Sequence, residues 1–106
     1  MNTDLQGTFR ALADPTRREI LRYLSARDMS IGEVADQFEM TRAAVKKHLI
    51  ILEEGQLISV RQEGRTRINH FEPVALKSAS EWFEFFNRFW DVRLNKLQQA
   101  IDKEKN

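Results

Sequence analysis

Two short runs of helical periodicity, separated by two residues, constrain this chain more than any other feature. The first run follows Ser30, whose hydroxyl can cap the free amides of a first helical turn, and Glu33 completes a capping-box pattern. The second run follows Thr41, another capping residue, and repeats its apolar residues at intervals of four and three. Residues 39–40 form the turn between them. Residues 30–57 therefore predict two packed helices joined by a tight turn.

The outer face of the second predicted helix is basic. No acidic residue occurs between Thr41 and Leu52, and Gly55 is expected to end the helix with a positive φ. A helix that enters the DNA major groove places its N-terminal residues nearest the base edges, and its positive end favours phosphate. We therefore predict a DNA-reading helix, and an amphipathic helix with merely solvated charges is the competing interpretation. The candidate DNA-contacting residues are Thr41, Arg42, Ala43, Lys46, Lys47 and His48.

After Gly55 the pattern changes from helical to extended. Residues 57–62 and 66–71 each predict a strand, and the glycine in 63–65 predicts a turn between them, so the segment forms a β-hairpin. A hairpin that directly follows a DNA-reading helix is a wing, which can follow the phosphate backbone or reach a minor groove. An exposed hairpin with ordinary edge charges is the alternative. The arginines proposed for DNA contact are Arg61, Arg65 and Arg67.

The charge is distributed unevenly along the 106 residues, although the net charge is only +1. Between Thr41 and Phe71 six basic residues accompany three acidic ones, whereas from Glu72 onward there are six of each. The positive excess therefore coincides with the predicted DNA-reading segment. A hydrophobic content of 42% without a membrane-spanning apolar run predicts a single soluble domain over residues 1–106.

Two further helices are predicted before residue 30. Residues 5–13 form the first, and the second begins at the Asp-Pro pair of residues 14–15 and runs to about residue 25. Arg17 and Arg18 lie in the first turn of this second helix. In a functional interpretation they touch phosphate or tie the helices together. In the other interpretation, which we favour, they are side chains exposed to solvent at the start of the helix.

The last third of the chain predicts one long helix, because no glycine or proline interrupts it after Pro73. Its length would be on the order of 45 Å, and its apolar residues form two neighbouring rows. A small domain cannot cover both rows, so we expect residues 1–13 and 74–105 to form dimerisation helices. Two alternatives stay open: burial of all the aromatic residues under the first helix, or a planar ligand held by Trp82, Phe86 and Trp90. The expected dimer contacts are Leu5, Phe9, Trp82, Phe86, Phe89, Trp90, Leu94 and Leu97.

The sequence offers no catalytic or metal-binding pattern. It contains no cysteine, and its two histidines, His48 and His70, lack a partner at helical spacing. It also lacks a glycine-rich phosphate loop and a nucleophile elbow. We therefore expect neither an enzyme nor a cofactor or metal site. The first residues show no secretory signal, so a cytoplasmic location is expected.

Three segments together resemble the ArsR-type winged-helix repressors. They are A-L-A-D-P-T-R-R-E-I-L-R-Y-L (11–24), M-T-R-A-A-V-K-K-H-L-I-I-L-E-E-G-Q-L-I (40–58) and R-Q-E-G-R-T-R-I-N-H-F (61–71). The resemblance implies a mainly α fold with a small β-hairpin (α+β), having five helices and a two-stranded wing. It also implies a homodimer that binds double-stranded DNA at an inverted repeat and usually represses nearby genes. A winged-helix module used for protein contact is the rival function.

The chain also departs from this family in ways that bear on its signal. Metal-sensing members often carry a Cys-x-Cys pair before the DNA-reading helix, and this chain does not, so the resemblance is to a metal-independent branch with an unknown effector. His48 matches a family histidine and is interpreted as a packing or DNA-contacting residue. Ile50 stands where polar residues are usual and meets either a thymine methyl group or another helix.

Overall fold

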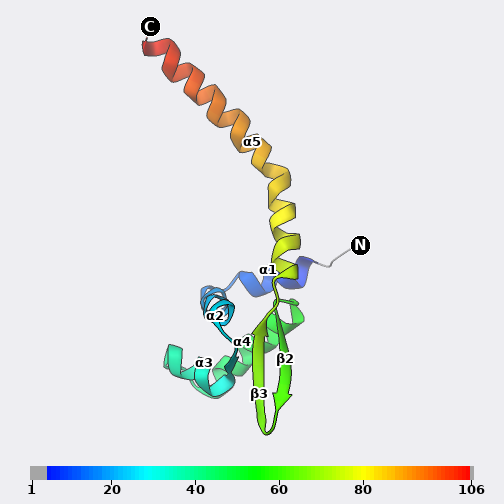
Figure 1. Cartoon of the computed structure of the whole chain (residues 1–106). Helices are drawn as coiled ribbons and strands as arrows, with labels where there is room; N and C mark the ends of the chain where they lie inside the picture. Colours follow the sequence, from blue (N-terminus) through cyan, green and yellow to red (C-terminus); the bar gives the residue numbers. More distant parts are fainter. Residues whose placement is uncertain (1–4, 106) are drawn as a thin grey trace.

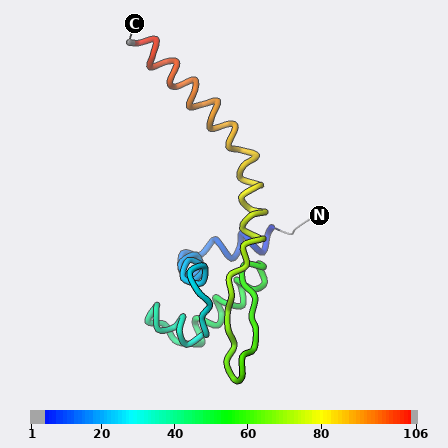
Figure 2. The backbone as a smooth tube through the Cα atoms, viewed as in Figure 1, coloured from blue at the N-terminus to red at the C-terminus, as the bar shows by residue number. Residues whose placement is uncertain are grey.

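The computed structural model describes residues 5–105, and within them the chain forms five helices and three short strands. Helices α1–α4 and the sheet make a small body, from which α5 projects as a long stalk (Figure 1). The β2–β3 hairpin leaves the body in the opposite direction (Figure 2). The elements are α1 (Leu5–Leu12), α2 (Pro15–Ala26), β1 (Met29–Ser30), α3 (Ile31–Phe38), α4 (Arg42–Glu54), β2 (Ile58–Glu63), β3 (Thr66–Phe71) and α5 (Val74–Lys105).

Side-chain caps set the start of α3 and of α4, as the sequence predicts. Ser30 Oγ accepts from the Glu33 amide at 3.2 Å, and Glu33 Oε1 accepts from the Ser30 amide at 3.0 Å, which completes the capping box. Thr41 Oγ1 accepts from the Ala44 amide at 3.1 Å. Glu39, with φ of 52°, makes the turn between the two helices. The predicted helix pair is therefore confirmed with its caps.

The prediction of a positive φ at Gly55 is wrong. Gly55 has φ of −79°, and the next residue, Gln56, takes the left-handed conformation with φ of 61°. Glycine is needed at residue 55 for a different reason: a Cβ there would lie 2.8 Å from the Gly7 carbonyl oxygen. The buried hydroxyl of Thr8 also donates to the Gly55 carbonyl oxygen at 2.9 Å. Gly55 is thus the point at which α1 docks against the end of α4.

The favoured interpretation of Arg17 and Arg18 as a solvated helix start is also wrong. Arg17 donates to the carbonyl oxygens of Ala11 at 2.8 Å and Arg10 at 2.9 Å, and Arg18 donates to that of Leu12 at 2.8 Å. The last carbonyl groups of a helix have no partner within that helix. The two arginines supply those partners and so tie the end of α1 to the start of α2.

The sheet has three antiparallel strands in the order β1-β3-β2, one more than the predicted two-stranded wing. The added strand is only Met29–Ser30, and it pairs with Asn69 and Ile68 of β3. Asn69 is buried and donates from Nδ2 to the Met29 carbonyl oxygen at 3.1 Å. Gly64, with φ of 62°, opens the two-residue turn between β2 and β3. The base of the hairpin is therefore fastened to the segment that precedes α3.

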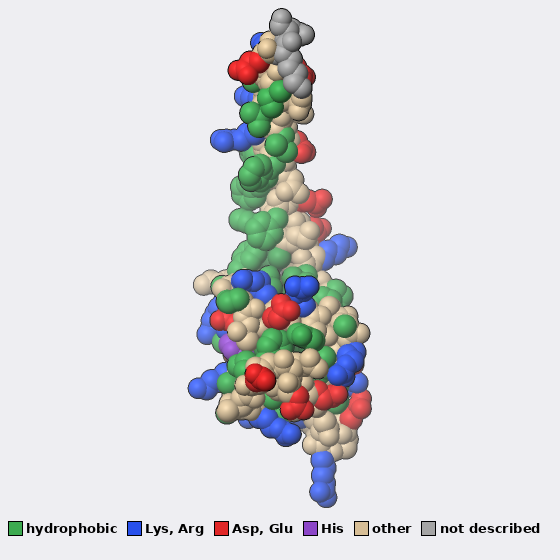
Figure 3. All heavy atoms as spheres, turned by 90° about the vertical axis from the view of Figure 1, so that its left-hand side faces the viewer, with side chains coloured by type: hydrophobic (Ala, Val, Ile, Leu, Met, Phe, Trp, Pro, Cys, Tyr) green, Lys and Arg blue, Asp and Glu red, His purple; other side chains and the backbone are tan. Residues whose placement is uncertain are grey.

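The hydrophobic core lies within the body, and α5 adds little to it. Ala75 and Ala79 are the buried side chains of α5, and only Ala75 belongs to the continuous core cluster. The radius of gyration is 19.2 Å, whereas a compact domain of this length has about 13 Å. The aromatic side chains from Trp82 to Trp90 are 41–65% exposed and form part of the apolar face of the stalk (Figure 3). In the single chain these side chains are therefore not core, although Phe9 of α1 contacts Trp82 and Phe83 at ring distances of 5.5 and 5.8 Å.

Candidate nucleic-acid interface

Helix α4 presents one apolar and one basic side. Val45, Leu49 and Leu52 are buried against the body, as their spacing predicts. The side chains on the outer surface come from the first two turns and are exposed, and they include most of the predicted DNA contacts: Thr41, Arg42, Ala43, Lys46 and Lys47. The sequence therefore places a basic helical face in solvent.

The charges on this surface are not neutralised by neighbours. Among residues 5–105, five of the predicted contact residues take part in no salt bridge: Arg42, Lys46, Lys47, Arg65 and Arg67. The Arg42 guanidinium lies over the start of α3, where a Cβ on Gly32 would come within 2.8 Å of Nη2. An unpaired cation has no protein partner to give up when it meets a phosphate, so these side chains form an anion-binding surface.

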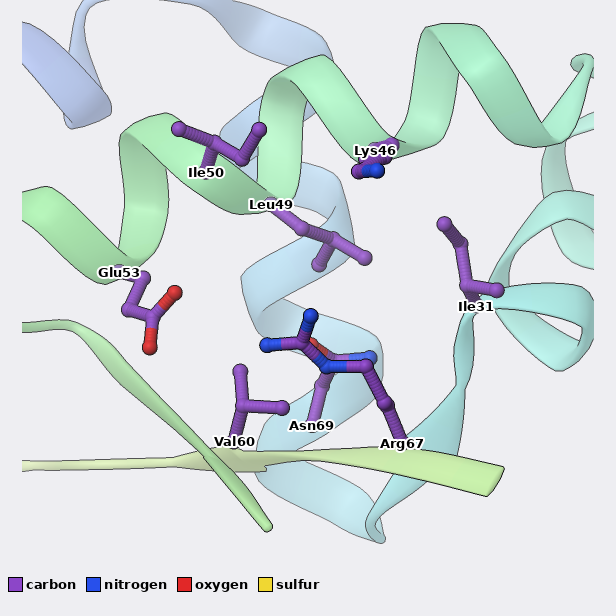
Figure 4. A pocket seen from close by; sticks show the side chains of 8 residues that line it. All are labelled: Ile31, Lys46, Leu49, Ile50, Glu53, Val60, Arg67 and Asn69. Carbon is purple, nitrogen blue, oxygen red and sulfur yellow. The ribbon is translucent and has the colours of Figure 1, made fainter. Parts of the chain in front are cut away.

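The structure does not gather the three wing arginines into one cluster. Arg65 lies in the exposed turn at the tip of the hairpin, where Figure 3 shows a basic side chain at the far end of the molecule. Arg67 lines the side of the hairpin that faces α4 (Figure 4). Arg61 pairs with Ile68 and so belongs to the other face of the hairpin. Each arginine therefore occupies a different environment.

Arg61 belongs to a charged cluster beside the hairpin that no pattern in the sequence predicts. Asp28 accepts from Arg61 Nη1 at 2.6 Å and lies 2.7 Å from His70 Nδ1, and Arg61 Nε donates to Glu63 at 2.6 Å. The bond from Arg61, followed by that from His70, lowers the pKa of Asp28. This cluster joins the loop before β1 to both strands of the wing. The cluster cannot be recognised from local spacing, because Asp28 is 33 residues from Arg61 and 42 from His70 along the chain.

A cleft of about 250 Å³ separates α4 from the hairpin (Figure 4). Its middle is apolar and its rim carries Lys46, Glu53 and Arg67. Ile50, whose role was open at the level of sequence, lines this cleft rather than packing against another helix. The full lining is Ile31, Lys46, Leu49, Ile50, Glu53, Val60, Arg67 and Asn69.

Known proteins with similar sequences identify the fold and its class of function. A family model described as "Helix-turn-helix domain" matches residues 12–61. The transcriptional repressor SdpR of Bacillus subtilis (strain 168) is 31% identical over 85 residues, which cover 79% of this chain and 94% of the relative. The HTH-type transcriptional regulator Rv2034 of Mycobacterium tuberculosis (strain ATCC 25618 / H37Rv) is 33% identical over 96 residues, covering 91% of this chain and 87% of the relative.

The solved structures agree with these relatives. An ArsR-family transcriptional regulator is 33% identical, with a TM-score of 0.74, and the match covers 82% of this chain and 90% of the other. The chain belongs to the ArsR family. An ArsR-like transcriptional regulator from Rhodococcus sp. RHA1 is 31% identical, with a TM-score of 0.72 over 91% of both chains. The prediction of a DNA-binding winged-helix regulator rather than an enzyme is therefore confirmed.

One predicted contact residue of this ArsR-family chain lies apart from the exposed basic face. His48 is half-buried, and its Nδ1 is buried without a hydrogen-bond partner among the described residues. The pKa of Asp14, at the start of α2, is lowered chiefly by a hydrogen bond from the Arg17 amide. His48 therefore lies in an environment different from that of Lys46 and Lys47, which are exposed.

The described part of the chain shows neither a metal-binding cluster nor a helix that could span a membrane. Residues 5–105 contain no group of three or more histidine or acidic side chains arranged to hold a metal ion. Over the same range, no helix is both long and apolar enough to cross a membrane. The basic face of α4 with the hairpin is thus the candidate site that the geometry favours.

Proposed function

We propose that the protein is a repressor that binds an inverted-repeat operator as a homodimer. The observation that carries this proposal is the set of exposed basic side chains on α4 and the hairpin that have no salt-bridge partner in residues 5–105. The family supplies the DNA-binding class, and SdpR, a relative with 94% of its length matched, is named a transcriptional repressor. Bound at a promoter, such a dimer would exclude other proteins from the same DNA.

The two basic elements suit different parts of the duplex. The first turns of α4 enter the major groove, where Ala43 allows close approach and Thr41 and Arg42 reach base edges. Lys46 and Lys47 neutralise phosphates, which position the helix without reading sequence. Arg65, at the tip of the hairpin, reaches the adjacent backbone or minor groove. DNA binding then depends on the excess of positive charge on α4 and the hairpin. The small net charge of the whole chain, +1, is compatible with it.

A second copy of the chain is the partner that best covers the stalk. Each aromatic side chain offers roughly 150–250 Å² for burial, and six of them stand exposed on α5 between Trp82 and Trp90. The planar-ligand alternative is disfavoured because the hollow at Phe86, Phe89, Trp90 and Arg93 has walls from α5 alone. Two-fold symmetry would also place two α4 helices about 34 Å apart, one turn of DNA. This arrangement makes α1 and α5 the dimerisation helices.

Two linked measurements test the proposal. Selection of bound sequences from random duplex DNA should return an inverted repeat. The double variant Lys46→Ala/Lys47→Ala should keep its fold, because alanine favours helix, and should lower the slope of log K against log salt by about one to two units.

The matched control removes two lysines from the far part of α5. Lys96→Ala/Lys103→Ala changes the net charge equally but leaves the basic face intact, so its salt slope should equal that of the wild type. Equal behaviour of the two double variants, or no sequence enriched by selection, would favour the protein-interaction module instead.

A further inference from the structure

The cleft between α4 and the hairpin has features that DNA binding does not use. We propose that it binds a small monocyclic carboxylate that carries a hydrogen-bond donor at the end opposite its carboxylate, and that this ligand competes with DNA. The inference rests on the proposed function in one respect: Lys46 and Arg67 are shared with the DNA-binding surface. Its four supporting observations are the apolar middle, the cationic end, the acidic end and the buried amide of the cleft.

The middle of the cleft is built to hold an apolar group. Leu49 is buried, Ile31 and Val60 are half-buried, and Ile50 is 45% exposed on an otherwise basic helical face. Figure 4 shows Leu49 and Ile50 of α4 above Val60 of β2, with the Arg67 guanidinium between Leu49 and Val60 and open space below Ile50. A sugar–phosphate backbone is polar and charged and gains little from such a surface, whereas a hydrocarbon ring is removed from water by it.

The two ends of the cleft carry opposite charges. Lys46 lies toward one end and Glu53 toward the other, and the Arg67 side chain extends from the Lys46 side toward the middle (Figure 4). Lys46 and Glu53 are seven residues apart on α4, which corresponds to roughly 10 Å along the helix. None of the three takes part in a salt bridge with the described residues. Lys46 and Arg67 complement a carboxylate, whereas Glu53 repels phosphate and complements a hydroxyl or amine donor.

Asn69 adds a polar group to the floor. It is buried, and its Nδ2 is already used to donate to the Met29 carbonyl oxygen. Asn69 lines the cleft, so its side-chain amide can meet a polar group of a ligand. A ligand that hydrogen-bonds to this polar group is favoured over one that leaves it facing an apolar surface.

The size of the cleft sets the class of ligand. A volume of about 250 Å³ is just below the 300–1,000 Å³ that drug-sized ligands occupy, so the ligand has a single ring. Its carboxylate would occupy Lys46 and Arg67, the cations that phosphates require under the proposed function. Binding of ligand and DNA at the same charges is mutually exclusive, so the ligand acts as an inducer.

Three probes separate the contributions of the two ends. They are 4-hydroxyphenylacetate, which has both polar groups, phenylacetate, which lacks the donor, and 4-hydroxyphenylethanol, which lacks the charge. Titration of the full chain without DNA, followed by backbone amide NMR, should give saturable shifts at Ile50, Val60 and Asn69. A probe that lacks either the hydroxyl donor or the carboxylate should bind about tenfold more weakly, the effect of one charge-assisted hydrogen bond.

Two variants place the ligand within the cleft. Ile50→Gln replaces an exposed apolar wall by a polar one of similar length, so the fold should persist while probe binding is lost. Glu53→Ala removes the acceptor and should abolish the preference for 4-hydroxyphenylacetate over phenylacetate. Arg65→Ala, at the hairpin tip, is the control and should bind the probes as the wild type does.

The competing outcomes are distinct. Absence of saturable cleft shifts up to about 10 mM probe, or equal binding of the uncharged alcohol, overturns the inference. If 4-hydroxyphenylacetate binds the cleft but does not displace DNA from a protein that binds DNA, the competition is overturned. Because the NMR titration contains no DNA, failure of the chain to bind DNA would refute the proposed function and leave the ligand site standing.

Discussion

At the scale of single residues, one backbone contact decides how closely α1 approaches α4. A Cβ at Gly55 would lie 2.8 Å from the Gly7 carbonyl oxygen and 3.1 Å from Ala11 Cβ, so Gly55→Ala should force the helices apart. We expect a loss of about 1–3 kcal/mol in the free energy of unfolding, measured by urea denaturation. Gly7→Ala is the matched control.

The control probes the same contact from its other side. A Cβ at Gly7 would lie 3.4 Å from the nearest neighbouring atom, the Glu54 carbonyl oxygen, and alanine favours helix over glycine. Gly7→Ala should therefore be neutral or stabilising by up to about 1 kcal/mol. Similar losses from both substitutions would show that α1 does not dock through Gly55.

Asp28 makes a second prediction at the residue scale. Its pKa in the folded chain is lowered by the hydrogen bonds from Arg61 and His70, so the unfolded state binds its proton more readily. The stabilisation is therefore present above the ordinary pKa of 3.8 and is lost as the pH falls below it. Asp28→Asn should lower stability at pH 7 and flatten the acid limb of stability against pH.

A control for the pH dependence of stability is the substitution of a carboxylate that has no such partners. Asp36 is exposed on α3 and takes part in no salt bridge with residues 5–105. Asp36→Asn should leave the profile close to that of the wild type. If both variants gave the same profile from pH 3 to 7 in urea denaturation, the Asp28 cluster would not fasten the wing.

At the scale of elements, the arginines of the wing have two expected roles: Arg65 contacts DNA, and Arg61 stabilises the fold. Arg65→Ala should leave stability unchanged and weaken DNA binding by about 1–3 kcal/mol if the side chain reads a groove, and by less if it meets only phosphate. Arg61→Ala should instead act through the fold, because it removes the hydrogen bonds that Arg61 donates to Asp28 and Glu63. Affinities for specific and random DNA, with thermal unfolding of both variants, separate these effects. If Arg65→Ala and Arg61→Ala lost the same DNA affinity and the same stability, Arg65 at the tip of the hairpin would not be a DNA contact.

The elements also show why sequence reasoning succeeds in some places and fails in others. The caps at Ser30 and Thr41 involve residues three apart, so local spacing was enough to predict α3 and α4. The strand Met29–Ser30 is too short to carry a pattern, and it exists because β3 lies beside it. The role of Gly55 was missed because its reason lies 48 residues away in Gly7.

In the candidate site, too, features set by local spacing were predicted and features set by distant contacts were not. The basic face of α4 follows from helical periodicity and was predicted, whereas the separation of Arg61 from Arg67 depends on the register of two strands. The cleft beside Ile50 requires α4, β2 and β3 together, and no spacing along one element reveals it. Distances along the chain, rather than the type of residue, set what could be foreseen.

At the scale of the whole molecule, the stalk is a helix without enough neighbours. Helix α5 has 32 residues, yet its buried side chains lie in its first two turns. Left in water, its aromatic face would promote aggregation, and burial at about 25 cal/mol per Å² would stabilise a complex by several kcal/mol. We therefore expect an obligate homodimer whose separated chains fold poorly.

Trp90→Glu tests this assembly directly. Trp90 is among the most exposed aromatic residues of the stalk, so in a monomer a glutamate would be harmless there, whereas in an apolar seam it would bury a charge. The variant should dissociate or unfold, and operator binding should collapse although every DNA-facing residue remains. Asn95→Glu is the matched control, because Asn95 continues the polar row of Glu84 and Asp91 along α5. It should sediment as the wild type does. A well-folded wild-type monomer at micromolar concentration that still binds its operator tightly would show that the stalk serves another partner.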